Sequence, residues 1–122
     1  MDATFIHGLI PAMITPMTEN EDLDEAGLKN LIDQLIDQGV HGIFTIGTAG
    51  EFWALTVEEK IHVFEWTVQF TDKRVPTYVG TCANSTREAV QLAEYAQESG
   101  VDCLSVLTPS FITPDDDQMF AH

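Results

Sequence analysis

Two stretches of this sequence resemble each other: residues 39–46 read GVHGIFTI, and residues 100–107 read GVDCLSVL. Each begins with a glycine, which favours the end of a helix. Each then continues as a short run of apolar and β-branched residues, which favours a buried strand. The repeated unit is therefore one strand with one helix, and a succession of such units builds a parallel sheet covered by helices.

The segments around these stretches carry helical periodicity and capping signals. Apolar residues recur at helical spacing at positions 28, 31, 32, 35 and 36, and Gly39 follows them. Residues 56–59 and 85–88 each show a hydroxyl residue followed three positions later by Glu, which is the pattern of a capping box. We therefore expect three helices: one that ends before Gly39, one that begins near residue 56, and one that runs from residue 85 to Gly100.

Short apolar runs predict strands at residues 42–46, 75–79 and 103–107, each buried on both faces, as parallel strands covered by helices are. Residues 9–14 predict a further strand, although Pro11 removes one backbone donor from it. A (β/α)8 barrel of about 250 residues uses roughly 31 residues for each unit, so a chain of this length corresponds to about four units. An open, flavodoxin-like sheet is the alternative at this length.

The last ten residues predict the start of one more helix. Thr113 suits the N-cap, Pro114 suits the first helical position, and the acidic residues 115–117 suit the positive end of the helix dipole. The sequence stops at His122, before such a helix has buried an apolar face. We therefore expect an α/β half barrel: residues 1–122 would be the N-terminal half of a single (β/α)8 (TIM) barrel domain, with four strands and about three and a half helices, truncated in helix four.

Composition excludes several classes of partner. The chain has 122 residues, 20 of them acidic and 5 of them Lys or Arg, which gives a net charge of -15. This balance argues against binding to nucleic acid or to an anionic membrane surface. No long apolar run or secretory signal is present, so a cytoplasmic protein is expected. Cys82 and Cys103 predict two buried free thiols, and the four scattered histidines predict no metal site.

Chemistry in parallel α/β folds gathers where strands end, so the segments 15–16, 47–51, 80–84 and 108–111 matter most. Residues 47–51 read GTAGE, and two glycines around Thr48 and Ala49 allow backbone amides to approach a ligand. Successive amides can bind an anion, with the Thr48 hydroxyl as a further donor. Because the chain has few cations, we predict that this turn binds the carboxylate of an acid substrate. An ordinary turn without function is the structural alternative.

Several motifs together resemble one known family. They are ITP at 14–16, GTAGE at 47–51, RVP at 74–76 with GT at 80–81 and Asn84 after it, and TP at 108–109 followed by an aromatic residue. The chain is similar, through essentially all 122 residues, to the N-terminal part of the dihydrodipicolinate synthase and N-acetylneuraminate lyase family. These are pyruvate-dependent class I aldolases on a (β/α)8 barrel.

The resemblance implies a Schiff-base mechanism on a small 2-oxo acid, in a homotetramer, with no cofactor beyond the covalent bond to a lysine. In the family that lysine lies on the sixth strand and a proton-shuttling tyrosine on the fifth, and neither strand falls within these residues. Lys29, Lys60 and Lys73 do not stand at the carboxyl end of a predicted strand. The segment alone is therefore expected to be inactive.

The resemblance also assigns roles to three residues. Thr48 corresponds to the family's hydroxyl residue in the proton relay, beside the substrate carboxylate. Ala49 stands where many members have a second threonine, so only its amide can bind that carboxylate. Phe111 stands where synthases have a tyrosine that reaches the neighbouring subunit, and its expected place is a subunit interface or the lining of the site.

These departures favour a 2-keto-3-deoxy sugar acid aldolase. Two alternatives remain at this point. One is a 4-hydroxy-tetrahydrodipicolinate synthase of lysine biosynthesis, and the other is a noncatalytic small α/β binding module.

Overall fold

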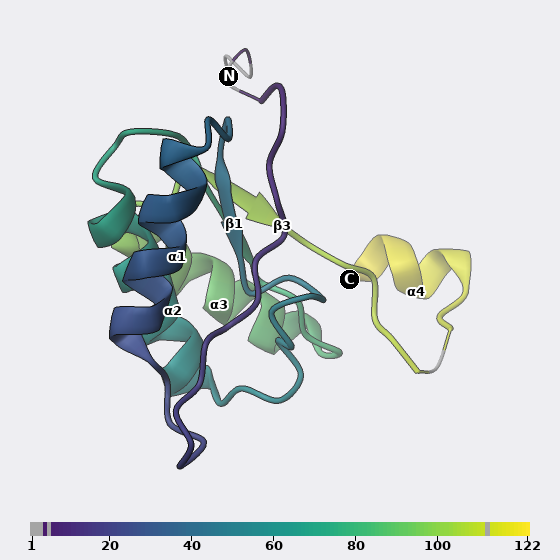
Figure 1. The fold of residues 1–122 in the computed structure, drawn as a ribbon. Coiled ribbons are helices and arrows are strands. Elements are labelled where there is room, and N and C mark those ends of the chain that lie inside the picture. The colour runs from purple at the N-terminus through teal and green to yellow at the C-terminus, as the bar shows by residue number, and fades with distance from the viewer. Residues whose placement is uncertain (1–3, 5, 112) are drawn as a thin grey trace.

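The computed structural model describes residues 4, 6–111 and 113–122, and it contains one parallel sheet of three strands in the order β1-β2-β3 (Figure 1). The strands are β1 (Ile43–Thr45), β2 (Thr77–Gly80) and β3 (Cys103–Ser105). The helices are α1 (Glu25–Asp37), α2 (Val57–Thr71), α3 (Thr86–Ser99) and α4 (Asp116–Ala121). Strands and helices alternate, as the repeated unit predicts.

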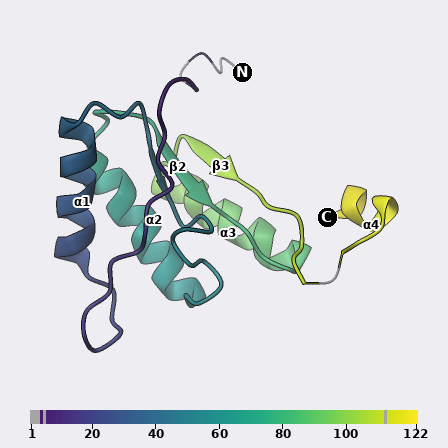
Figure 2. The same cartoon turned by 45° about the vertical axis from the view of Figure 1, so that its right-hand side comes forward.

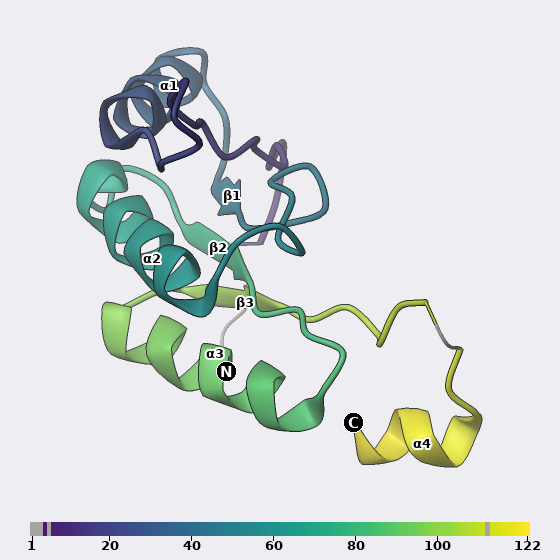
Figure 3. The same cartoon turned by 90° about the horizontal axis from the view of Figure 1, so that it is seen from below.

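One face of the sheet carries the core. The helices α1, α2 and α3 lie side by side along this face, whereas α4 lies apart from it (Figures 2 and 3). Thr45 is in register with Val79, and Val79 with Leu104, so these three side chains point to the same face. Thr45 bonds Thr67 of α2 through their hydroxyls at 3.0 Å, which identifies this face as the helical one. Side chains that are fully buried in this layer are Leu28, Ile32, Ile43, Val63, Phe64, Val79 and Leu92.

The predicted helix ends are largely confirmed. Thr56 and Glu59 form the reciprocal capping box of α2, and Gly39 and Gly100 adopt the left-handed backbone with φ of 84° and 85°. At α3 only half of the predicted box forms, because Ser85 accepts from the amide of residue 88 while no reciprocal bond returns. The carboxylate of residue 88 faces a cation of α2 instead, as described below.

The end of α2 was not predicted, because no glycine marks it. Asp72 and Lys73 both adopt positive φ, 46° and 58°. Arg74 stabilises this end, since its guanidinium donates to the carbonyl oxygens of Phe70 at 2.6 Å and Thr71 at 3.0 Å. Such carbonyls at the last turn have no partner within the helix.

The same Arg74 guanidinium joins α2 to α1 through Asp33, at 2.5 Å. Lys29, one helical turn before Asp33, adds a second ion pair at 2.6 Å. The hydrogen bond from Lys29, and then that from Arg74, lowers the pKa of the Asp33 carboxyl. Asp33 therefore stays ionised into acid solution.

The predicted strand at residues 9–14 is wrong as a strand. Only one isolated parallel bridge forms, between Ala12 and Phe44, although the segment does run beside β1. Two backbone bonds hold it there: His41 N to Leu9 O at 2.8 Å and Met13 N to Phe44 O at 2.9 Å. Pro11 between them has no amide hydrogen, so a continuous ladder cannot form.

The predicted burial of residues 103–107 on both faces is also wrong. Leu104 is 39% exposed and Val106 is 59% exposed, because β3 is the sheet edge and α4 does not cover it. The predicted N-cap at Thr113 is wrong as well. Asp115 is the N-cap, since its carboxylate and the Gln118 side chain form the reciprocal capping box. A carboxylate at this position accepts from the first amides and suits the helix dipole.

Candidate functional site

The loops that follow the strands meet at the carboxyl edge of the sheet, as expected for a parallel α/β fold. The amide of Thr81 donates to the carbonyl oxygen of Ser105 at 3.0 Å. Beyond it, Asn84 Oδ1 accepts from the amide of Ser110 at 2.8 Å and from its hydroxyl at 3.1 Å. The loop after β2 is thus tied to the loop after β3 at two places.

A buried thiol adds a third tie between these loops. Cys82 Sγ accepts from the amide of Leu107 at 3.4 Å and approaches the carbonyl oxygen of Ser105 at 3.5 Å. Burial raises the pKa of the Cys82 thiol, so it remains protonated at neutral pH. Protonated and enclosed, it serves as a small packed side chain with weak hydrogen bonds.

The turn at residues 47–50 presents the predicted anion-binding groups. It is closed by a bond from Gly50 N to Gly47 O at 3.0 Å, and Glu51 N donates to Thr48 O at 3.1 Å. Both glycines are buried, while Thr48 and Ala49 stand exposed at the tip. Within the described residues, the amides of Thr48 and Ala49 donate no hydrogen bond, so both can donate to a ligand.

The first residues of this turn pack closely against β2, and this contact determines the position of the turn. Ile46 adopts φ of 55°, a conformation that β-branched residues rarely take. Its carbonyl oxygen lies against Gly80, where a Cβ would stand only 2.0 Å away. The Phe44 ring lies under Gly47, 3.0 Å from the place that a Cβ there would occupy. The absence of side chains at Gly47 and Gly80 therefore permits the turn to sit directly on the sheet edge.

Two threonines in the segments expected to matter, Thr15 and Thr81, had no role assigned from the sequence. Thr81 is fully buried, and its hydroxyl has no hydrogen-bond partner among the described residues. Thr15 donates its hydroxyl to the carbonyl oxygen of Gly50 at 2.8 Å. The motifs at 14–16 and 80–81 contained both threonines, but only the tertiary structure shows what their hydroxyls face.

Lys60 is buried, which the sequence did not indicate. Only 6% of its side chain is exposed, and its Nζ lies 3.7 Å from Glu88 Oε1. It lines a cavity of about 250 Å³ together with Trp53, Asn84 and Ser110. Trp53 is 62% exposed, and its ring packs edge-on against that of the neighbouring Phe52, with 5.4 Å between the ring centroids.

A larger cavity of about 490 Å³ lies at the opposite, amino edge of the sheet. Asp102 and Thr77 line it, and they are already bonded to each other: Asp102 Oδ2 accepts from the amide and from the hydroxyl of Thr77, both at 2.8 Å. These bonds tie β2 to the start of β3. The polar side-chain atoms of Thr77 and Asp102 are therefore already used in joining the two strands.

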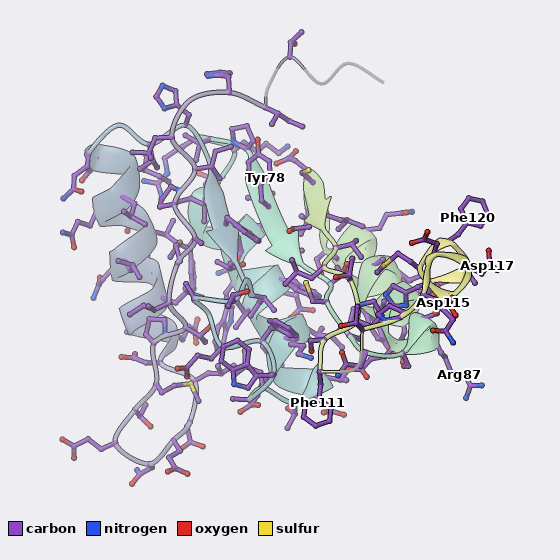
Figure 4. All side chains as sticks on the ribbon, turned by 90° about the vertical axis from the view of Figure 1, so that its right-hand side faces the viewer. Tyr78, Arg87, Phe111, Asp115, Asp117 and Phe120 are labelled. Carbon is purple, nitrogen blue, oxygen red and sulfur yellow. The ribbon has the colours of Figure 1, made fainter. Side chains whose placement is uncertain are left out.

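Phe111 lies at the end of the loop after β3. It is fully exposed, its backbone has φ of 73°, and its ring projects away from the sheet (Figure 4). The structure therefore places Phe111 on the same edge as Thr48 without bringing the two into contact within the chain. Phe120 of α4 is 94% exposed and also projects outward (Figure 4).

Two absences hold for the part of the chain that the structure describes. No three His, Cys, Asp or Glu side chains gather closely enough to hold a metal ion. No helix has the length and apolar composition needed to cross a bilayer. Cys82 and Cys103 are both free, and Cys103 is only half-buried where full burial was expected.

Comparison with known proteins identifies the family. Residues 5–122 match the family described as the dihydrodipicolinate synthetase family. The chain belongs to that family. A 4-hydroxy-tetrahydrodipicolinate synthase from Methanothermobacter thermautotrophicus is 40% identical over 117 residues, which are 96% of this chain and 41% of that protein. The resemblance drawn from the motifs is thus confirmed.

Solved structures of the dihydrodipicolinate synthetase family share the fold. The dihydrodipicolinate synthase of Aquifex aeolicus matches with a TM-score of 0.89 and 37% identity, over 93% of this chain and 38% of that one. The E. coli K12 prophage protein YagE, solved in complex with pyruvate, matches with a TM-score of 0.92 and 34% identity, over 95% and 39%.

These matches confirm the expected fold class, part of a (β/α)8 barrel. The chain spans about two fifths of the length of the relatives it matches.

Proposed function

We propose that the whole protein, meaning the natural protein that carries these 122 residues, acts on pyruvate through a Schiff base as a 4-hydroxy-tetrahydrodipicolinate synthase. The observation that carries the proposal is the turn at residues 47–50. It stands at the carboxyl edge of the sheet and leaves the amides of Thr48 and Ala49 open beside a hydroxyl. Such a group of donors suits the carboxylate of a 2-oxo acid.

The names of the relatives favour the synthase. Curated relatives at 38% to 42% identity, including the one from Methanothermobacter thermautotrophicus, are named 4-hydroxy-tetrahydrodipicolinate synthase. This moves our preference away from the sugar-acid aldolase that Ala49 and Phe111 suggested. It also weighs against a noncatalytic module, because the named relatives are enzymes.

The roles within this segment are binding and proton transfer. The amides of Thr48 and Ala49 would hold the carboxylate, and the Thr48 hydroxyl would pass a proton in the relay that the family resemblance implies. The nucleophilic lysine would come from outside residues 1–122. Lys29 lies on α1 and pairs with Asp33, and Lys60 lies on α2 beside Glu88, so neither stands at the carboxyl end of a strand.

The sugar-acid aldolase remains a second candidate on one observation. Phe111 carries no hydroxyl and projects fully into solvent, so it cannot pass a proton in the way that the tyrosine of family synthases does. Its full exposure leaves the ring free to pack against another subunit, the place that the resemblance implies, and burial of the ring there would be favourable.

Two assays on the whole protein separate the candidates. In the first, pyruvate is supplied together with an amino-acid semialdehyde. The semialdehyde provides the ring nitrogen and the second carboxylate of the product, 4-hydroxy-tetrahydrodipicolinate. In the second, a 2-keto-3-deoxy sugar acid is supplied and released pyruvate is measured. We expect the first to proceed with the higher kcat/KM. A higher kcat/KM in the second would favour the aldolase, and inactivity in both would favour the noncatalytic module.

A variant tests the assigned role of Thr48. Thr48→Val removes the hydroxyl but keeps the amide, so we expect kcat to fall about 100-fold or more, as for loss of a proton-transfer group. Pyruvate binding through the amides should persist. Thr18→Val is the matched control, because Thr18 holds only the exposed turn at residues 18–22 through its hydroxyl. Equal kcat in the two variants would contradict the role.

A further inference from the structure

The turn at residues 47–50 is held by a side chain from a distant part of the sequence. Thr15 lies 35 residues before Gly50 and donates its hydroxyl to the Gly50 carbonyl oxygen at 2.8 Å. Gly50 is buried and Thr15 is half-buried, so water has limited access to this bond. Gly50 also donates its amide to Gly47 O, which closes the turn. Thr15 therefore bonds the same residue that closes the turn.

Thr15 is itself fixed on both sides. Before it, Met13 N donates to Phe44 O of β1 at 2.9 Å, and after it, Pro16 O accepts from Asp24 N at the start of α1 at 3.0 Å. A following proline also restricts Thr15 to an extended backbone. The hydroxyl is therefore presented from a segment that is anchored to the sheet and to a helix.

The segment around Thr15 packs directly against the turn at residues 47–50, which leaves little room for another contact to replace this bond. A Cβ at Gly50 would lie 3.1 Å from Met13 O and 3.2 Å from Thr15 Oγ1. On the opposite side of the turn, Ile46 is pressed against Gly80, as described above. The turn is thus fixed at its first end by β2 and at its last end by Thr15.

We infer that Thr15 is a positioning residue that orients the amides of Thr48 and Ala49 toward the substrate carboxylate. The inference rests on the proposed function for the identity of the ligand. Thr15 does not touch the ligand in this account. Its hydroxyl keeps Gly50 in place, and the turn then presents two amides without having to order them on binding, which is the advantage of a preorganised site.

Removal of the hydroxyl should loosen the turn without removing any group from the site. Thr15→Val keeps the shape of the side chain and removes the donor, and Thr15→Ser keeps the donor. A net hydrogen bond corresponds to a roughly threefold to tenfold change in an equilibrium. The control is Thr18→Val, in a neighbouring turn whose hydroxyl bonds are local.

Two measurements on the whole protein test the inference. The first is hydrogen exchange at the amides of Gly50 and Glu51, which the closed turn protects and which needs no substrate. The second is the pyruvate concentration that gives half-maximal trapping by borohydride, with kcat measured alongside. We expect Thr15→Val to raise both the exchange rates and the half-saturating concentration about threefold to tenfold, with kcat within about twofold of wild type. Thr15→Ser should restore both.

The outcomes separate this inference from the proposed function. If Thr15→Val exchanges like Thr18→Val at Gly50 and Glu51, Thr15 does not hold the turn and the inference fails. If exchange rises but the half-saturating pyruvate concentration does not, Thr15 holds the turn without positioning it for pyruvate, and the inference also fails. If pyruvate does not label the wild-type protein, the proposed function fails. The part of the inference that concerns the substrate carboxylate then fails with it.

Discussion

The contact between Gly80 and Ile46 makes a sharp prediction for the substitution Gly80→Ala. A Cβ on residue 80 would stand 2.0 Å from the Ile46 carbonyl oxygen and 2.8 Å from its carbonyl carbon. Both atoms belong to the backbone, so no side-chain rotation relieves the overlap. Ile46 already has a positive φ, which leaves it little freedom to turn its carbonyl away.

The size of the effect follows from the displacement required. Bringing the Cβ and the oxygen to 3.0 Å from 2.0 Å needs a movement of about 1 Å in the backbone of β2 or of the turn. Overpacking of this kind costs about 1–3 kcal/mol, and occasionally more, even when side chains can yield. Because only backbone can yield here, we expect a loss of about 3 kcal/mol in the free energy of unfolding.

The assay is urea unfolding of the whole protein, with Gly100→Ala as the matched control. Gly100 has φ of 85° but no atom within 4 Å of its Cβ position, so its substitution carries only the conformational cost of about 1–2 kcal/mol. We expect Gly80→Ala to lose more stability than Gly100→Ala, and to weaken pyruvate trapping because the turn moves. A Gly80→Ala protein as stable as wild type would refute the reasoning.

Three further predictions concern the helical layer and its edges. Leu92→Ala should cost about 2–5 kcal/mol in the free energy of unfolding by urea, because Leu92 is fully buried. Val90→Ala, on the exposed side of α3, should change that free energy by no more than about 0.5 kcal/mol. Similar losses in the two variants would contradict the assigned core. Thr67→Val should cost about 1–3 kcal/mol by leaving the buried Thr45 hydroxyl without its partner, and an unchanged free energy of unfolding would contradict this role of the bond. Asp33→Asn should lower the free energy of unfolding at pH 7. This loss should shrink as pH falls below about 4, because a carboxyl with a lowered folded-state pKa stabilises the fold only while it is ionised. A loss that is constant with pH would contradict the ion pairs.

The regular elements could be predicted because local signals agree with the tertiary structure. Periodicity and capping patterns located α1, α2 and α3, and Gly39 and Gly100 marked helix ends by their left-handed backbone. Where the stabilising contact is tertiary, prediction failed. The end of α2 depends on the Arg74 guanidinium reaching helix carbonyls and Asp33 of another helix, and no local pattern encodes that.

The candidate site divides in the same way. The glycines around Thr48 and Ala49 indicated a turn with open amides, and the structure presents one. The partners that hold the turn could not be predicted, because the bond from Thr15 crosses 35 residues of sequence. The burial of Lys60 was equally hidden, since its position on α2 is compatible with either solvent or the cavity that the segments after β1, β2 and β3 line.

The central claim is that these residues form the carboxylate-holding part of a pyruvate Schiff-base enzyme whose lysine lies elsewhere. The direct measurement is borohydride reduction of the whole protein in the presence of pyruvate, followed by peptide mapping of the labelled lysine. We predict one label, on a lysine outside residues 1–122, with labelling competed by other small 2-oxo acids. Labelling on Lys29, Lys60 or Lys73, or no pyruvate-dependent label at all, would contradict the claim.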